Sequence, residues 1–290
     1  MKNTNSEKGT EEILKEIRTE DNKLEKLNLN SIKVGNAFSN IGTKKRSSNL
    51  KHLGLSSCEM GKDNMAQLAS WIKKESKLKK LILSFNSIFD TGLKNLSSSF
   101  IDLVLLEDLN LNGCAFGSDG LKILLHSLEK SSSIHSLDIC ENKIENEGLI
   151  FLSEFLQSNS SLTSLNLKGN LFDDQSFPTF CSSLCKNTAL KRLDLSNNKI
   201  GNDAVFSLSS VLSENNYLVH LNLKKTQFGD KSLNFLCGSL KKNNTLTTLN
   251  ISENDFTSGG IKSISKMLKK KQKFVNAPSF KNSHLCSVCK

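Results

Sequence analysis

The sequence predicts an α/β solenoid in the form of a horseshoe, with a parallel β-sheet on its concave face and α-helices on its convex face. The first observation is a period of 28 residues in the apolar residue that opens each unit. These residues are Leu50, Leu78, Leu106, Ile134, Leu162, Leu190, Leu218 and Leu246. The second observation is that each unit carries a strand pattern followed by a helix pattern. Neither half can bury its apolar side alone, so neighbouring units must stack.

Positions in each unit are numbered from 1 to 28, starting at the opening leucine. Positions 4 and 6 are apolar with a polar residue between them, which indicates a short strand with one buried face. Position 11 is apolar in every copy, and positions 16, 19 and 23 follow at helical spacing, as in Leu93, Leu96 and Phe100. Helices (~10 Å between axes) are wider than strands are spaced (~4.8 Å), so the stack must curve with its sheet inside.

Two further positions have structural explanations. Position 9 is a short polar side chain or cysteine in every copy, as in Asn86 and Cys114, which can satisfy backbone groups after the strand. We expect stacked copies to form a ladder. Position 15 is small in nearly every copy, as in Gly92 and Gly120, which indicates a helix start packed closely against its neighbour.

The ends of the chain differ from the repeats. We expect residues 1–23 to be a disordered start followed by a capping helix over residues 11–18, with Thr10 as its N-cap. The solenoid covers residues 24–273, about nine repeats, and its first copy is degenerate and begins at Leu24. Residues 274–290 are predicted to be a basic tail that contains cysteine.

The charge of the chain is concentrated near its end. The formal net charge is +10, but eight lysines and no acid lie between Phe256 and Lys290, which leaves +10 − 8 = +2 for the rest. Only three of the 39 basic residues are arginine, so a nucleic-acid partner is not expected. A weak contact with an anionic surface through Lys262–Lys281 stays open.

No secretory signal is visible at the start of the sequence, and no apolar run approaches the ~18 residues of a membrane span. We therefore expect a monomeric cytoplasmic protein, with the nucleus or delivery into a host cell as alternatives.

The phrase Leu190-Lys-Arg-Leu-Asp-Leu-Ser-Asn-Asn-Lys-Ile200, followed by a small residue and a helix, resembles the leucine-rich repeat of the ribonuclease-inhibitor-like class. The resemblance covers about residues 24–272. It implies an α/β horseshoe that binds other macromolecules, usually proteins, along its concave face. The chain departs from the NOD-like receptors and tropomodulins, whose additional domains are not visible in it. It departs from the Ran GTPase-activating proteins in having a basic rather than an acidic tail.

No catalytic set is predicted, so we expect no enzyme and no cofactor. The repeat spacing separates most of the five histidines, His52, His126, His135, His220 and His284. The alternative of a small-GTPase regulator would need a positioned arginine, for which Arg46 is the loop candidate.

Six of the eight cysteines are scattered through the repeats, which indicates a reducing compartment. Cys58 and Cys114 are ladder residues. Cys181 and Cys237 are small packing residues, and Cys140 faces the concave side. The remaining two, Cys286 and Cys289, lie near His284 and are weak candidates for metal ligands, because no second pair completes a zinc site.

The predicted partner site lies on the concave face, into which positions 3, 5, 7 and 8 project. Ile82 and Phe85 interrupt a polar surface and are predicted to be apolar anchors, unless Phe85 folds down over the preceding turn. The orienting charges are an acidic group followed by a basic group: Asp108, Asp138, Glu141, Lys168, Arg192 and Lys224. The sequence thus predicts a protein–protein interaction scaffold. A secreted bacterial effector that binds host proteins is an alternative, suggested by the Lys-, Asn- and Ser-rich composition.

Overall fold

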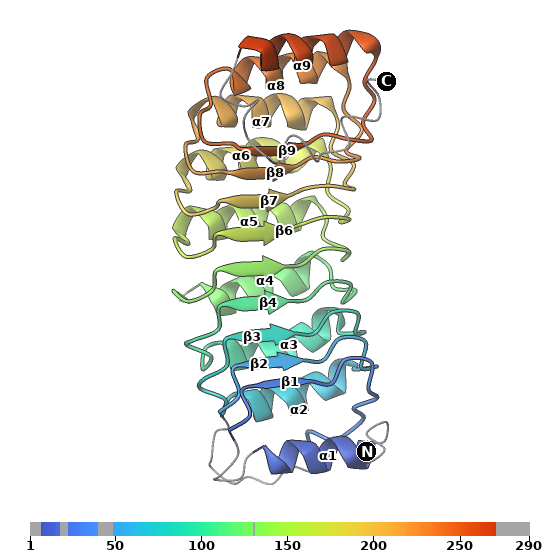
Figure 1. Ribbon diagram of the computed structural model, residues 1–290. Coiled ribbons are helices and arrows are strands. Elements are labelled where there is room, and N and C mark those ends of the chain that lie inside the picture. Colours follow the sequence, from blue (N-terminus) through green and yellow to red (C-terminus); the bar gives the residue numbers. More distant parts are fainter. Residues whose placement is uncertain (1–6, 18–22, 40–48, 130, 271–290) are drawn as a thin grey trace. The chain divides into compact units, whose positions relative to one another are not determined.

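The computed structural model describes residues 7–17, 23–39, 49–129 and 131–270. The chain divides into two compact units, unit 1 from Met1 to Lys143 and unit 2 from Ile144 to Lys290. In each unit the repeats alternate one short strand with one helix, so that a layer of parallel strands is backed by a layer of helices (Figure 1). Arg46 and the proposed metal ligands His284, Cys286 and Cys289 lie outside the described residues.

The described residues of unit 1 form five strands that follow one another in chain order. The strands are β1 (Lys26–Asn28), β2 (His52–Gly54), β3 (Lys80–Ile82), β4 (Asp108–Asn110) and β5 (Ser136–Asp138). The helices are α1 (Glu7–Glu16), α2 (Lys62–Ile72), α3 (Phe89–Phe100) and α4 (Ser118–Leu128). From β2 onward, paired residues are one repeat apart, as in Lys80 beside Asp108. The degenerate first copy also forms a strand, β1, which pairs with β2.

Unit 2 repeats the arrangement. Its strands are β6 (Ser164–Asn166), β7 (Arg192–Asp194), β8 (His220–Asn222) and β9 (Thr248–Asn250). Its helices are α5 (Asn146–Ser158), the 3₁₀ turn η1 (Asp174–Ser176), α6 (Phe177–Lys186), α7 (Asn202–Glu214), α8 (Asp230–Leu240) and α9 (Ser258–Lys270). The predicted α/β solenoid, with parallel strands on one side and helices on the other, is confirmed within both units.

The core consists of the apolar positions that the repeat predicts. In the third repeat Leu78, Leu81, Leu83 and Ile88 are fully buried, and the same positions are buried in the other complete repeats with few exceptions. Full burial of one such side chain stabilises the fold by ~1.5–3 kcal/mol. Burial of the strand face against the helices therefore explains why strands only three residues long persist.

The ladder at position 9 is confirmed. The side chain of Asn86 lies inside the turn, where its Oδ1 accepts hydrogen bonds from the backbone N–H groups of Cys58 and Met60, both at 3.0 Å. Its Nδ2 donates to the carbonyl groups of Leu55 at 2.7 Å and Leu83 at 2.8 Å. One amide thus joins two repeats and satisfies backbone groups that are out of reach of water.

Unit 2 has a second ladder, which the sequence analysis missed. It is formed by the asparagines at position 26, which follow the helices: Asn159, Asn187, Asn215 and Asn243. Nδ2 of Asn187 donates to the carbonyl groups of Leu156 and Asn159 at 2.8 and 3.1 Å, while its Oδ1 accepts from the N–H of Leu190 at 2.8 Å. The period of 28 residues in these asparagines was the signal that could have revealed it.

Position 13 caps the helix of the next repeat. Oδ1 of Asp90 accepts the N–H groups of Gly117 and Gly120, at 2.7 and 3.0 Å, at the start of α4. Asp174 accepts from Ala204 at the start of α7 in the same way. The carboxylate satisfies helix donors that have no partner within the helix and complements the helix dipole. A Cβ at Gly120 would overlap Oδ1 of Asp90, which explains the small residue at position 15.

The predicted start of the first helix is wrong. Helix α1 begins at Glu7, and Thr10 lies fully buried within it rather than capping it. Residues 7–9, which we expected to be disordered, are helical. Burial of Thr10 together with Leu14 and Ile17 explains the earlier start, because tertiary packing outweighs a local capping preference.

The cysteines of the described repeats are free thiols. Burial raises the pKa of Cys114 and of Cys181 to about 12, whereas Cys185 is exposed. We expect a thiol reagent at pH 8 to modify Cys185 in the folded protein and to leave Cys114 and Cys181 unmodified, because the thiolate is the reactive species. Mass spectrometry of peptides from native and denatured protein measures this. Equal labelling of Cys181 and Cys185 in the native protein would contradict the packing shown.

Candidate interaction surface

The surface on the strand side is formed mainly by positions 3, 5 and 8. Position 7, which was also expected to project outward, is buried at Ser84, Cys140 and Ser196 and half-buried in the other complete repeats. The reason is that the chain turns at this point, and small side chains fold into the turn. The Oγ of Ser196, for example, donates to Oδ1 of Asp194 at 2.6 Å.

Position 5 has a structural role. Its amide or carboxylate oxygen accepts the N–H of position 7 in the same repeat, as Asp138 does from Cys140 at 3.1 Å and Asn222 from Lys224 at 3.1 Å. This hydrogen bond holds the turn that follows the strand. The recurring Asn or Asp at position 5 is therefore explained by the turn that it stabilises. In the third repeat Ile82 occupies position 5 and cannot accept this bond, so that repeat exchanges a turn contact for a half-exposed apolar side chain.

Position 8 adopts a left-handed backbone in every repeat. The φ values of Ser57, Phe85, Glu141, Asn197 and Lys225 all lie between 53 and 57°. Gly113 and Gly169 occupy the same position, and glycine is the residue that adopts this conformation without strain. For a bulky side chain the left-handed conformation costs roughly 1–2 kcal/mol. Phe85 is therefore the least suitable of these residues for its backbone.

Phe85 is also the largest side chain in this column, and 58% of its surface is exposed. Its ring lies over the next repeat, where a Cβ added to Gly113 would come within 2.7 Å of Cδ1 of Phe85. The alternative that the ring covers the preceding turn is therefore wrong. The glycine leaves room for the ring, and the ring in turn stays accessible to solvent.

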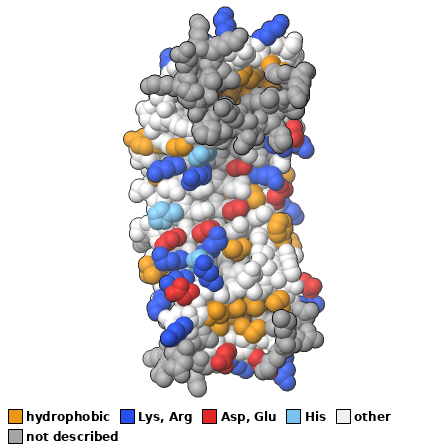
Figure 2. Space-filling view, in the orientation of Figure 1, with side chains coloured by type: hydrophobic (Ala, Val, Ile, Leu, Met, Phe, Trp, Pro, Cys, Tyr) orange, Lys and Arg blue, Asp and Glu red, His pale blue; other side chains and the backbone are white. Residues whose placement is uncertain are grey.

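The predicted acidic group is partly neutralised within unit 1. Lys79 pairs with Glu107 and Lys80 pairs with Asp108, each at 2.6 Å. The hydrogen bond from Lys79 lowers the pKa of Glu107. Figure 2 shows positive and negative side chains interspersed over the strands of this unit, and no separate acidic block. Exposed pairs of this kind add little stability, but they reduce the field that a partner would sense.

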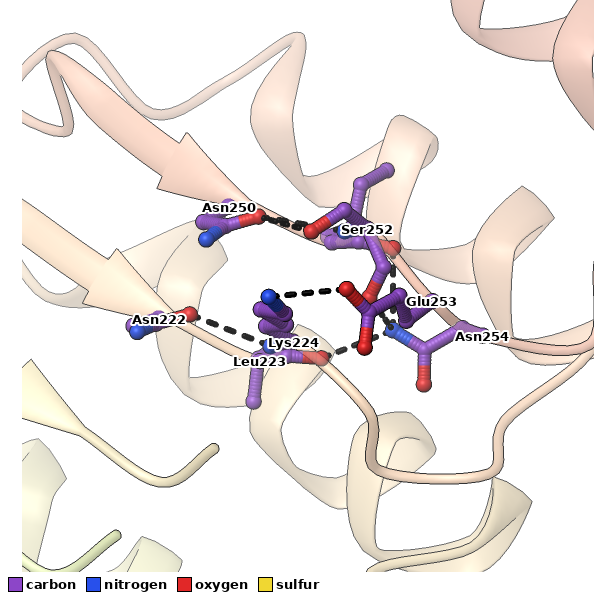
Figure 3. Close-up of polar contacts among 8 residues, drawn as sticks. Asn222, Leu223, Lys224, Asn250, Ser252, Glu253 and Asn254 are labelled. Carbon is purple, nitrogen blue, oxygen red and sulfur yellow. Dashed lines mark hydrogen bonds and ion pairs between the residues drawn. The ribbon is translucent and has the colours of Figure 1, made fainter. Parts of the chain in front are cut away.

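The basic group in unit 2 is also partly paired. Nζ of Lys224 lies 2.8 Å from Oε1 of Glu253, and this hydrogen bond lowers the pKa of Glu253. Figure 3 shows the two side chains pointing toward one another. Arg192 is exposed on β7 and forms no ion pair with any described residue. His220 is its neighbour on β8, and burial together with the charge of Arg192 lowers the pKa of that histidine. Arg192 is thus one available cation among the described residues of this face.

The predicted residues fall into two groups. Ile82, Phe85, Asp108, Asp138 and Glu141 belong to unit 1, and Lys168, Arg192 and Lys224 belong to unit 2. Sequence reasoning missed the effect of Lys79 and Lys80 on the acids of the following repeat. Their spacing of 28 residues from Glu107 and Asp108 was the available signal, because residues one repeat apart lie side by side on neighbouring strands.

Within the described part of the chain, no three His, Cys, Asp or Glu side chains gather in a way that could hold a metal ion. None of the helices among the described residues is both long enough and apolar enough to cross a bilayer.

The repeats match a known protein family. A family model described as Leucine Rich repeat matches residues 75–97, 104–124, 130–153, 186–209, 214–237 and 242–265. No curated protein sequence matches the chain.

Two solved structures show a limited likeness. One, described as Leiomodin-1 Actin-Binding Site 2, is 25% identical with a TM-score of 0.38, covering 45% of this chain and 78% of that one. The other, a Caenorhabditis elegans tropomodulin C-terminal domain, is 15% identical with a TM-score of 0.42, covering 62% of this chain and 95% of that one. With TM-scores this low, neither likeness indicates what the chain binds.

Proposed function

Since this chain is a leucine-rich repeat protein, we propose that it is a non-enzymatic scaffold that binds a protein partner on the strand side of its repeats. The observation that carries the proposal is Phe85. A bulky aromatic side chain occupies a left-handed position and is more than half exposed, where neighbouring repeats use glycine or polar residues. Backbone strain of this kind clusters at binding and active sites.

Ile82 supports the same conclusion. It lies on β3, three residues before Phe85, and replaces an amide or acid that holds the turn in most other repeats. The third repeat thus gives up a turn hydrogen bond and accepts backbone strain within one short segment. Both changes leave apolar surface on the strand side. Aromatic and aliphatic anchors within a polar surface are typical of the centre of a protein interface.

The charged residues supply orientation rather than most of the affinity. Arg192 has no intramolecular ion pair among the described residues, so an acidic group of the partner can pair with it. Asp108 and Lys224 are already paired with Lys80 and Glu253. We therefore assign them a smaller part in binding than the sequence suggested, because a partner must first displace the existing pair.

The partner is first identified by affinity capture from the native cell. The decisive variant is then Phe85→Gly, which removes the anchor and gives the backbone its preferred residue. We expect capture to weaken by ~30-fold or more, as for a hot-spot residue. The free energy of unfolding should stay level or rise by up to about 1 kcal/mol, because released strain offsets the lost packing on Gly113. Titration calorimetry and urea denaturation measure the two quantities.

Ser57→Gly is the matched control. It makes the same substitution at the same left-handed position of the preceding repeat, with no loss of apolar surface. We expect it to leave capture unchanged. Adding Arg192→Glu to Phe85→Gly should weaken capture further, because it places a negative charge opposite the partner's acid. If Phe85→Gly captures the partner as well as the parent chain does, the site assignment is wrong.

Two other functions remain distinguishable by direct assay. Regulation of a small GTPase would appear as faster nucleotide hydrolysis by that GTPase, abolished by Arg46→Ala. Delivery into a host cell as an effector would make the captured partner a protein of the host. Both alternatives rest on the sequence rather than on a described contact.

A further inference from the structure

A second apolar surface lies in the loop between α3 and β4. Ile101, Val104 and Leu105 are 70%, 67% and 44% exposed, although each is a large aliphatic side chain. Five of the six exposed large apolar residues described in unit 1 belong to this one repeat, and these three form a group of their own. We name Ile101, Val104 and Leu105 the α3–β4 loop patch.

The loop does not need these side chains in order to fold. Two backbone hydrogen bonds define its shape, Leu103 N–H to Phe100 O at 3.2 Å and Leu106 N–H to Leu103 O at 3.0 Å. The preceding repeat makes the same two bonds, Glu75 N–H to Ile72 O at 2.8 Å and Leu78 N–H to Glu75 O at 3.0 Å. There the equivalent exposed positions hold Lys73, Ser76 and Lys77. The same turn therefore forms with polar side chains, and folding does not explain the apolar ones.

Positive charge borders the patch on one side. Lys73 and Lys77 occupy the positions of Ile101 and Leu105 in the preceding repeat, whose helix α2 packs beside α3. Lys73 and Lys74 form no ion pair with any described residue, and Nζ of Lys77 donates to an amide oxygen, that of Asn49, at 2.7 Å. The lysines thus keep uncompensated charge beside exposed aliphatic surface.

We propose that the α3–β4 loop patch, together with Lys73 and Lys77, binds an amphipathic protein segment whose apolar stripe is bordered by acidic side chains. The aliphatic groups take up the stripe, and the lysines select for the acids by charge complementarity. A bilayer fits less well, because exposed Asp102 lies within the loop and would enter the headgroup region with Ile101. The patch precedes β4 and Phe85 follows β3, so the two surfaces lie at opposite ends of the strands.

Two synthetic peptides of about 18 residues, five helical turns, test the proposal. One carries leucine on one helical face and glutamate on the other, and its counterpart carries lysine in place of glutamate. Fluorescence anisotropy with the full chain should show binding of the acidic peptide, at least ~10-fold tighter than the basic one. The triple variant Ile101→Ser, Val104→Ser, Leu105→Ser should lose this binding by a similar factor and keep its thermal midpoint, since polar residues occupy these positions in the preceding repeat.

Lys73→Glu with Lys77→Glu provides an independent variant that leaves the loop itself intact. It should weaken binding of the acidic peptide and favour the basic one. Phe85→Gly, which alters only the strand-side site, is the control and should bind the acidic peptide as the parent chain does. If the acidic peptide does not bind the loop patch, the proposal for the strand-side site is unaffected. Equal binding of both peptides, or full binding by the triple variant, would overturn the proposal. So would loop-dependent binding to phosphatidylcholine–phosphatidylserine vesicles, or a dimer that the triple variant dissociates in sedimentation.

Discussion

Replacing Asn86 by leucine is expected to lower the free energy of unfolding by roughly 4 kcal/mol. Asn86 is 3% exposed and satisfies two backbone N–H groups and two carbonyl groups of two repeats. Leucine has a similar volume but neither donor nor acceptor. Each buried backbone group that loses its partner costs about 1–3 kcal/mol. Urea denaturation measures the loss.

Asn86→Cys is the matched control, because cysteine occupies this position in two neighbouring repeats. The thiol of Cys58 donates to the carbonyl of Leu29 at 3.1 Å, and that of Cys114 to the carbonyl of Leu83 at 3.3 Å. Cysteine can therefore serve a carbonyl but is a poor acceptor for the two N–H groups. We expect Asn86→Cys to lower the free energy of unfolding, but by less than Asn86→Leu does. If Asn86→Leu unfolds at the urea concentration of the parent, the ladder does not stabilise the stack.

Two glycine-to-alanine substitutions in helices are expected to change stability in opposite directions. Gly120→Ala in α4 should cost about 2–3 kcal/mol, because the new methyl group overlaps the Asp90 carboxylate and forces the cap apart. Gly238→Ala in α8 should stabilise the chain by about 1 kcal/mol, since nothing lies within 4 Å of the new Cβ and alanine favours a helix. Thermal and urea unfolding of the two variants provide the measurement.

A double-mutant cycle tests the cause. Asp90→Ala alone should cost about 1–2 kcal/mol through the lost cap. In that background Gly120→Ala should cost less than in the parent, because the oxygen that it would meet is gone. The contact between Asp90 and position 120 then appears as a coupling energy of at least ~0.5 kcal/mol, the difference between the loss in the double variant and the sum of the two single losses. Strictly additive losses would show that the carboxylate of Asp90 does not occupy the space at Gly120.

The parts of the fold that could be predicted are those in which one residue type recurs for one local reason. The buried leucines and the asparagines at position 9 meet the same surroundings in every repeat, so their spacing predicted both core and ladder. The cap from Asp90 to α4 could not be foreseen in this way. It joins two helix starts, and their relative position follows only from the finished stack.

The candidate site was harder to predict than the core for a similar reason. Phe85 and Ile82 were recognisable as departures from a polar column, but nothing in a phenylalanine signals a left-handed backbone. Gly113 and Gly169 at the same position were the available hint. Lys80 neutralises Asp108 because strands one repeat apart lie side by side, an effect that a reading of each residue by itself overlooks. Thr10 was misassigned because burial, not capping, sets the start of α1.

The caps and ladders also give the array a direction. Asp230 reaches forward to the start of α9, whereas Asn243 reaches back to the carbonyl groups of Leu212 and Asn215. During synthesis, the helix start of each new repeat is therefore capped by a residue of the preceding repeat. The asparagine of the new repeat then satisfies the carbonyl groups in the turn of the preceding repeat. Truncation at the two ends should therefore fray different parts of the protein. Removal of an N-terminal repeat leaves the next helix start uncapped, and removal of a C-terminal repeat leaves the carbonyl groups of the preceding turn without partners.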